Sequence, residues 1–247
     1  MPKRRYYKIN NIYHIYNRGV DKRNIFLDRR DYKRFINNIF IYNDENIKCR
    51  NLNNSYHFNK TRKNKLKTRK IIEIEEDNSR DIFVEVLSFC LMPNHFHFIL
   101  RPKKSDGIQK FLQKLCAGYS LYFNERYSRS GSLFQGRYKD VPIEDEKHFN
   151  WIPYYIHCNP LDLKFPGWRK GNLKSIKEAI KFLDFYEWSS HLSYLENKHL
   201  APMIHKEFLR EDLGLGDEYL NNFRDWLSNK KSFDSVNEEL ILESKHG

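Results

Sequence analysis

Two histidines interrupt an apolar run in LMPNHFHFIL, residues 91–100. Successive side chains in a strand point to opposite faces, so His95 and His97 share one face, and Phe96 and Phe98 point into the core. We expect the histidine face to be the open side of the sheet. Two imidazoles about 7 Å apart along a strand, from its rise of roughly 3.3 Å per residue, can converge on one divalent metal ion. A bare pair of this kind is more often two hydrogen-bonded histidines, so a metal site needs a third ligand from elsewhere.

A candidate for that ligand lies in WIPYYIHCNP, residues 151–160. On a helix, Tyr155 and Asn159 are four residues apart and share a face. The carboxamide oxygen of Asn159 is a competent ligand for a hard metal, and Tyr155 would be held one turn away from it. Tyr154 competes for the role of the reactive tyrosine, but its face is rotated by about one hundred degrees. Taken alone, the segment also fits an ordinary amphipathic helix that ends at Asn159 before Pro160.

The elements that must position these residues follow a regular order. Strand, helix, strand, strand, helix, strand and helix is the order of a compact α+β unit with an antiparallel sheet. Pro153 removes one backbone donor from the last helix and should kink or restart it. The chain after about residue 170 is expected to be partly helical. The expected strands are 12–18, 82–92 and 95–102, and residues 131–143 are expected to form a short strand, a turn and another strand. The expected helices begin at Asp31, at Gly107 and just after Asp145, which should cap the last one.

The composition points to a polyanionic partner. The 247 residues carry a net charge of +12, and the pI is about 9.4. Such an excess favours DNA, RNA or an anionic membrane surface as partner, although a basic protein without such a partner is possible. No run approaches the roughly 18 apolar residues of a membrane span, and the N-terminus lacks the apolar core of a signal peptide. The four scattered cysteines indicate reduced thiols, so we expect a cytoplasmic protein with no membrane partner.

Four blocks together resemble a known family. PNHFHFIL is similar to the HUH motif (His, bulky apolar residue, His) of single-tyrosine transposases. YHIYNRGVDKRNIF, GSLFQGRYK and YYIHCNPL follow the order and spacing of the REP-associated tyrosine transposase branch of the IS200-like family. The resemblance covers roughly residues 10–165. It implies a ferredoxin-like, RRM-like fold, an antiparallel sheet with helices on one face. The region after about residue 170 is not covered by the resemblance, and its own pattern indicates a mainly helical extension. We therefore expect a catalytic domain over 1–165, with a basic insertion at about 44–80, and a helical extension over 166–247.

The resemblance also implies a reaction. Family members cut and rejoin single-stranded DNA at hairpin-bearing ends, so the expected partner is single-stranded or hairpin DNA, bound by a monomer or a homodimer. Carried over by position, Tyr155 is the nucleophile that forms a 5′-phosphotyrosine. His95, His97 and Asn159 are the metal ligands, with glutamine common at the last position in insertion-sequence relatives. Mg²⁺ or Mn²⁺ suits this donor set.

Several cations are candidate DNA contacts. Residues 60–70, KTRKNKLKTRK, contain seven cations in eleven residues and indicate a solvated loop that can also lie along a phosphate backbone. Each cation taken alone is more often an ordinary surface charge. The side chains of Phe134 and Tyr138 could stack on unpaired bases or pack in the core. The DNA-contact candidates are Arg18, Arg137, Lys139, Lys63, Lys65 and Arg69.

Two other functions are compatible with parts of this pattern. The first is a non-catalytic, domesticated binder of structured DNA or RNA, against which the complete His–His–Tyr–Asn set argues. The second is a metal-dependent hydrolase of small phosphodiesters, in which water attacks and Tyr155 positions the substrate. The net charge of +12 and the lack of a Gly-rich nucleotide loop argue against the second.

Overall fold

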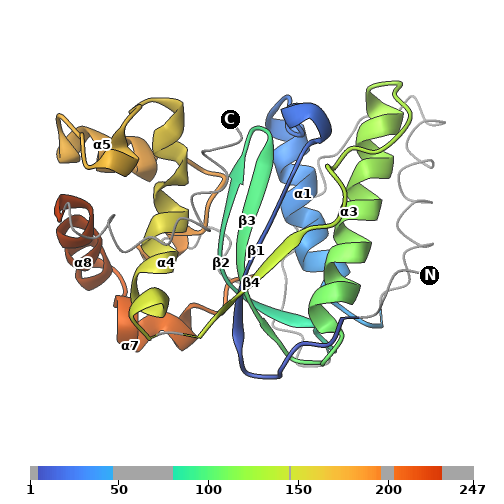
Figure 1. Ribbon diagram of the computed structural model, residues 1–247, viewed down its shortest axis with the longest axis horizontal. Coiled ribbons are helices and arrows are strands. Elements are labelled where there is room, and N and C mark those ends of the chain that lie inside the picture. The colour runs from blue at the N-terminus through green and yellow to red at the C-terminus, as the bar shows by residue number, and fades with distance from the viewer. Residues whose placement is uncertain (1–4, 47–79, 145, 196–202, 230–247) are drawn as a thin grey trace, which may run out of the picture.

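Four strands form one antiparallel sheet at the centre of the molecule (Figure 1). The computed structural model describes residues 5–46, 80–144, 146–195 and 203–229. The strand order β2-β3-β1-β4 and the antiparallel pairing are those of the expected ferredoxin-like unit. The strands are β1 (Ile12–Arg18), β2 (Val84–Met92), β3 (His95–Pro102) and β4 (Lys139–Ile143).

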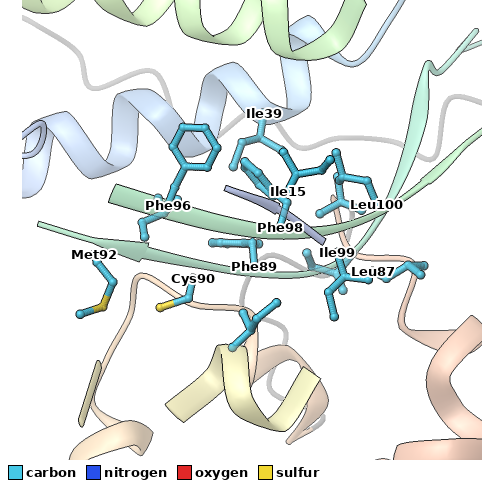
Figure 2. Close-up of a cluster of buried hydrophobic side chains, with 14 of the residues drawn as sticks. Ile15, Ile39, Leu87, Phe89, Cys90, Met92, Phe96, Phe98, Ile99 and Leu100 are labelled. Atoms are coloured by element: carbon cyan, nitrogen blue, oxygen red, sulfur yellow. The ribbon is translucent and has the colours of Figure 1, made fainter. Parts of the chain in front are cut away.

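Two helices cover one face of the sheet, α1 (Arg29–Tyr42) and α3 (Gly107–Arg126). Phe96 and Phe98 point from β3 toward this layer (Figure 2). Phe35 of α1 lies 5.3 Å from Phe96 between ring centroids, and Phe111 of α3 lies 6.2 Å from Phe98. The alternation along HFHF therefore places both phenylalanines in the core, as the sequence predicts.

The opposite face is covered as well. Figure 1 shows α4, α5, α7 and α8 on the side of the sheet away from α1 and α3. The expectation of helices on one face holds for the ferredoxin-like pair, and the chain from α4 onward adds a second layer. These later elements are α4 (Glu146–Cys158), α5 (Ile176–Asp184), α6 (His191–Tyr194), α7 (Arg210–Leu213) and α8 (Asp217–Ser228), with 3-10 turns at Asn159–Leu163, Trp168–Lys170 and Lys206–Leu209.

A buried polar network ties the second layer to the sheet. The hydroxyl of Tyr219 on α8 lies 2.8 Å from Nδ1 of His157 on α4 and 2.8 Å from Nδ1 of His191. Nε2 of His157 lies 2.9 Å from the Ser88 hydroxyl on β2 and 2.8 Å from that of Ser190. Burial holds the pKa of His157 well below its usual range and raises the pKa of Tyr219. His157 is therefore a structural residue of this network.

Most local predictions are confirmed. The helix α4 runs from Glu146 to Cys158 and gives way to a 3-10 turn at Asn159, but it does not restart at Pro153, which lies inside it. Within the described residues, no helix is long and apolar enough to cross a bilayer. The described cysteines, Cys90, Cys116 and Cys158, are free thiols.

Other predictions concern residues that the structure does not describe. The expected cap Asp145 and most of the 44–80 insertion, including the 60–70 run, are not among the described residues. The division at 165/166 remains a prediction. The same buried core includes side chains from both sides of that boundary, among them Tyr155, Trp168 and Phe223.

Candidate active site

The two histidines of β3 lie side by side on the sheet face that meets α4. Their ring centroids are 5.1 Å apart and the rings meet edge to face. The shared face is as predicted, but the expectation that both face an open side is wrong for His97, which is 1% exposed. The second layer of the fold covers this face, a long-range feature that strand alternation cannot reveal. His95, at the start of the strand, is partly exposed.

Each histidine has its Nδ1 atom held by a neighbour. Nδ1 of His95 lies 2.6 Å from Oδ1 of Asn94, an oxygen that can accept but not donate, so this Nδ1 carries the proton. Nδ1 of His97 lies 2.9 Å from Nε2 of His14 on β1, and the two rings are nearly parallel, 9° apart. Metal-binding histidines commonly have their second nitrogen fixed in this way. The arrangement favours Nε2 as the ligating atom of both His95 and His97.

The turn before β3 is fixed by a separate segment of the chain. The amide of Gly19 donates to the carbonyl of Asn94 at 2.8 Å, and the amide of Ile25 donates to that of Pro93 at 2.8 Å. Nδ2 of Asn94 donates to the carbonyl of Lys22 at 3.2 Å, which leaves Oδ1 of Asn94 directed at His95. The block that follows β1 thus orients the first histidine.

The second half of the site lies at the end of α4 and in the 3-10 turn that follows it. Tyr155 and Asn159 share a helix face, and both accept hydrogen bonds from one guanidinium, that of Arg169. Nη1 of Arg169 donates to the Tyr155 hydroxyl, and Nη2 donates to Oδ1 of Asn159 at 2.7 Å. Tyr155 is 3% exposed and Asn159 is fully buried. The pair predicted from i,i+4 spacing is therefore brought together, and a residue from a later turn joins it.

Arg169 is itself anchored. Its Nη2 lies 2.6 Å from Oδ2 of Asp162, whose Oδ1 also accepts from Nε1 of Trp168 at 2.5 Å. The guanidinium lies 4.9 Å from the Tyr155 ring centroid and 4.8 Å from that of Trp168. A cation that lies beside two aromatic rings and is paired with a carboxylate has a fixed direction, so its two remaining contacts are directed as well.

The neighbouring tyrosine points elsewhere. The hydroxyl of Tyr154 donates to the carbonyl of Leu213 at 3.3 Å, and its ring lies 5.8 Å from Tyr219 and 5.7 Å from Phe223. This side chain is packed against α8. The geometry favours Tyr155 over Tyr154 as the tyrosine that belongs with Asn159.

Two of the candidate DNA contacts are in register with the histidines. Arg18 on β1 is directly opposite His95, and Lys139 on β4 is opposite Tyr16, which in turn is opposite His97. Directly opposed residues of antiparallel strands share a face. Lys139 is exposed, and Nε of Arg18 donates to Oε1 of Gln135 at 2.8 Å. Both cations therefore lie on the histidine side of the sheet.

The remaining candidates for contact with DNA differ in exposure, and three of them lie outside the described residues. Arg137 is exposed, with its guanidinium 5.3 Å from the ring centroid of Tyr138. Phe134 and Tyr138 are buried, at 5% and 7% exposure, which favours packing over base stacking. The other three candidates, Lys63, Lys65 and Arg69, lie outside the described residues.

The side chains of His95, His97 and Asn159 meet the requirements of a divalent metal site only in part. Among the residues that the structure describes, no group of three His, Cys, Asp or Glu side chains is arranged to hold an ion. A site at His95 and His97 therefore needs a ligand of another type, and the carboxamide of Asn159 is one. The histidines fit the role through their held Nδ1 atoms, whereas Oδ1 of Asn159 faces the guanidinium of Arg169.

Sequence reasoning missed four residues of this site. His14 is recognisable in YHIYNR as a histidine on an alternating strand, but its contact with His97 depends on strand register. Asn94 directly precedes His95 in the sequence, and this adjacency could have indicated a contact between the two side chains. Arg169 and Asp162 lie in a segment without periodicity, and nothing local indicates that they meet Tyr155.

The family comparison agrees with the block that contains His95 and His97 and with the block that contains Tyr155. Residues 53–159 match the family model described as "Transposase IS200 like". A solved structure titled as the REP-associated tyrosine transposase bound to a REP hairpin is 12% identical, with a TM-score of 0.45. That comparison covers 81% of this chain and 87% of the other. No curated protein matches the chain. The family match confirms the resemblance over this segment.

Proposed function

We propose that this chain, which over residues 53–159 belongs to the IS200-like transposase family, is a metal-dependent transposase that cleaves and rejoins single-stranded DNA next to hairpins. The observation that carries the proposal is that the helix bearing Tyr155, α4, packs against β3, the strand that bears His95 and His97. The Nδ1 atoms of His95 and His97 on β3 are held by Asn94 and His14, and Tyr155 on α4 and Asn159 in the next turn share one contact, Arg169. The family match encloses all four residues.

The role of each residue follows from its chemistry. His95, His97 and Oδ1 of Asn159 would hold Mg²⁺ or Mn²⁺. When bound, the ion supplies Lewis-acid stabilisation of the negative charge on the scissile phosphate. The His14 and Asn94 contacts keep the imidazoles in one orientation. Arg18 and Lys139, on the same face, are placed to contact neighbouring phosphates.

Tyr155 supplies the covalent step. Its phenolic oxygen attacks phosphorus, a new oxygen–phosphorus bond forms, and the bond to the 3′ oxygen breaks. The phenolic proton is lost and the departing strand takes up a proton as its free 3′-OH, while the other strand remains attached through its 5′ phosphate. One phosphoester bond replaces another, so a 3′-OH can reverse the step and join a new strand without a nucleotide cofactor.

The substrate class follows from the charge and from the family. A net charge of +12 suits a long polyanion. The IS200-like resemblance indicates DNA ends that carry hairpins with single-stranded flanks. We expect such a hairpin to bind more tightly than a blunt duplex of equal length.

One observation favours a second candidate, a non-catalytic binder of structured DNA or RNA. Tyr155 is 3% exposed and Asn159 is fully buried, so a phosphate cannot reach the hydroxyl in the described arrangement. In a binder this burial would be permanent. In a transposase it would be relieved when the site is occupied.

Cleavage of a hairpin with a single-stranded flank tests the proposal. The full chain is incubated with the flank labelled at either end, with Mg²⁺, Mn²⁺ or EDTA. We expect a metal-dependent cut that leaves a free 3′-OH, detected by extension with a polymerase, and loss of the cut in His97→Gln. Tight hairpin binding with no cut over a panel of family-type hairpins would favour the binder.

A further inference from the structure

One guanidinium contacts both groups that the proposed reaction needs at the end of α4 and in the turn after it. Arg169 donates to the hydroxyl of Tyr155 and to Oδ1 of Asn159, and Asp162 holds it from the other side. The atom of Asn159 that would face a divalent cation therefore faces a monovalent one. The hydroxyl of Tyr155 is capped by the same group. These three partners and Arg169 are called the Arg169 latch below.

We infer that Arg169 competes with the divalent metal for Asn159 and keeps Tyr155 capped, so that the described arrangement is the resting form of the site. The inference rests on the proposed function, because it assigns Asn159 to the metal. It adds a positioning residue, Arg169, whose displacement couples occupation of the metal site to release of the nucleophile.

Competition follows from electrostatics. A guanidinium within hydrogen-bond distance of a ligand oxygen repels a divalent ion that binds the same oxygen, and the low local dielectric of a buried site strengthens that repulsion. Asn159 is fully buried, so water screens the two cations poorly. Metal at Oδ1 of Asn159 and Arg169 in its present position are therefore mutually unfavourable.

The side chain of Arg169 lies close enough to the surface to move toward solvent. Its side chain is 22% exposed and that of Asp162 is 38% exposed, so the ion pair lies at the edge of the buried site. The guanidinium can keep its carboxylate partner while it turns toward solvent, or toward a phosphate of bound DNA. Either movement uncaps the hydroxyl of Tyr155, while the rings of Trp151 and Trp168, each 6.0 Å from the Tyr155 ring between centroids, still contact the side chain.

Metal affinity of the free protein tests the inference without reference to activity. Mn²⁺ binding to the full chain is measured by EPR for wild type, Arg169→Gln, Arg169→Lys and Lys170→Gln. Lys170 is an exposed neighbour and its variant removes one positive charge without touching the latch. We expect Arg169→Gln to bind Mn²⁺ on the order of tenfold more tightly than Lys170→Gln. Arg169→Lys keeps the charge but cannot span both acceptors, so it should bind more tightly than wild type.

The possible outcomes distinguish failure of the Arg169 latch from failure of the proposed metal site. Loss of Mn²⁺ binding in His97→Gln, together with equal affinity in Arg169→Gln and Lys170→Gln, would overturn the latch and leave the metal site standing. Equal Mn²⁺ binding in wild type and His97→Gln would overturn both.

A measurement on the wild-type chain covers the case in which an Arg169 variant fails to fold. Tyrosine nitration by tetranitromethane is mapped by peptide mass spectrometry with and without Mn²⁺. Nitration of Tyr155 should rise several-fold with Mn²⁺, and that of Tyr154, packed against α8, should not. An unchanged level at Tyr155 under saturating Mn²⁺ would contradict the inference.

Discussion

The two histidines of β3 differ in burial, so we expect their substitution to affect stability differently. His97 is 1% exposed and is hydrogen-bonded to His14, whereas His95 is partly exposed at the end of the strand. We expect His97→Ala to lower the free energy of unfolding by about 2 kcal/mol, because it leaves a cavity and removes the partner of a buried group. His95→Ala should cost about 1 kcal/mol or less. Urea denaturation at neutral pH measures both, and an equal cost would contradict the difference in burial.

The contact between His14 and His97 gives a prediction about metal affinity. His14→Phe keeps a ring of similar size but cannot hold Nδ1 of His97. We expect it to weaken Mn²⁺ binding by about 10-fold or more, as other losses of such supporting contacts do. His14→Gln keeps a hydrogen-bonding group and should retain more affinity. Isothermal titration with Mn²⁺ compares the variants, and full affinity in His14→Phe would remove His14 from the site.

At the scale of elements, the ferredoxin-like unit could be predicted because its signals are local. The alternation in HFHF and the helical spacing from Ile108 to Phe123 report buried faces directly. The second layer could not be predicted in this way. Its contacts join residues far apart in sequence, such as Tyr154 and Leu213 or Tyr155 and Arg169. The i,i+4 spacing predicts that Tyr155 and Asn159 lie together, but nothing in the sequence predicts that Arg169 contacts both.

A buried hydroxyl on α8 links this helix to α4 by hydrogen bonding. The Tyr219 hydroxyl is shared by His157 and His191, both fully buried. We expect Tyr219→Phe to lower the free energy of unfolding by about 2 kcal/mol, because two buried imidazoles lose a partner. Tyr154→Phe, which gives up one bond of 3.3 Å, should cost less. Thermal denaturation followed by circular dichroism measures the pair. A larger loss in Tyr154→Phe would show that the network does not anchor α8.

At the scale of the whole molecule, the net charge of +12 predicts steep salt dependence of DNA binding. The seven cations of residues 60–70 are expected to contribute affinity and no chemistry. Replacing all seven with serine should flatten the plot of log affinity against log salt, by up to about 5 units of slope for single-stranded contacts. Fluorescence anisotropy with a flanked hairpin measures the slope. Cleavage of saturating substrate should stay nearly unchanged, and collapse of the chemical step would place these residues in the active site.

The central claim is that Tyr155 forms a covalent bond with DNA. The direct measurement is a denaturing gel of full-length protein incubated with Mn²⁺ and a hairpin flank labelled at its 5′ or its 3′ end. The adducted peptide is then identified by mass spectrometry. We predict a metal-dependent adduct that carries the 3′ label and not the 5′ label and maps to Tyr155. It should be lost in Tyr155→Phe and kept in Tyr154→Phe. Efficient cleavage with no adduct, or an adduct that survives in Tyr155→Phe, would contradict the account.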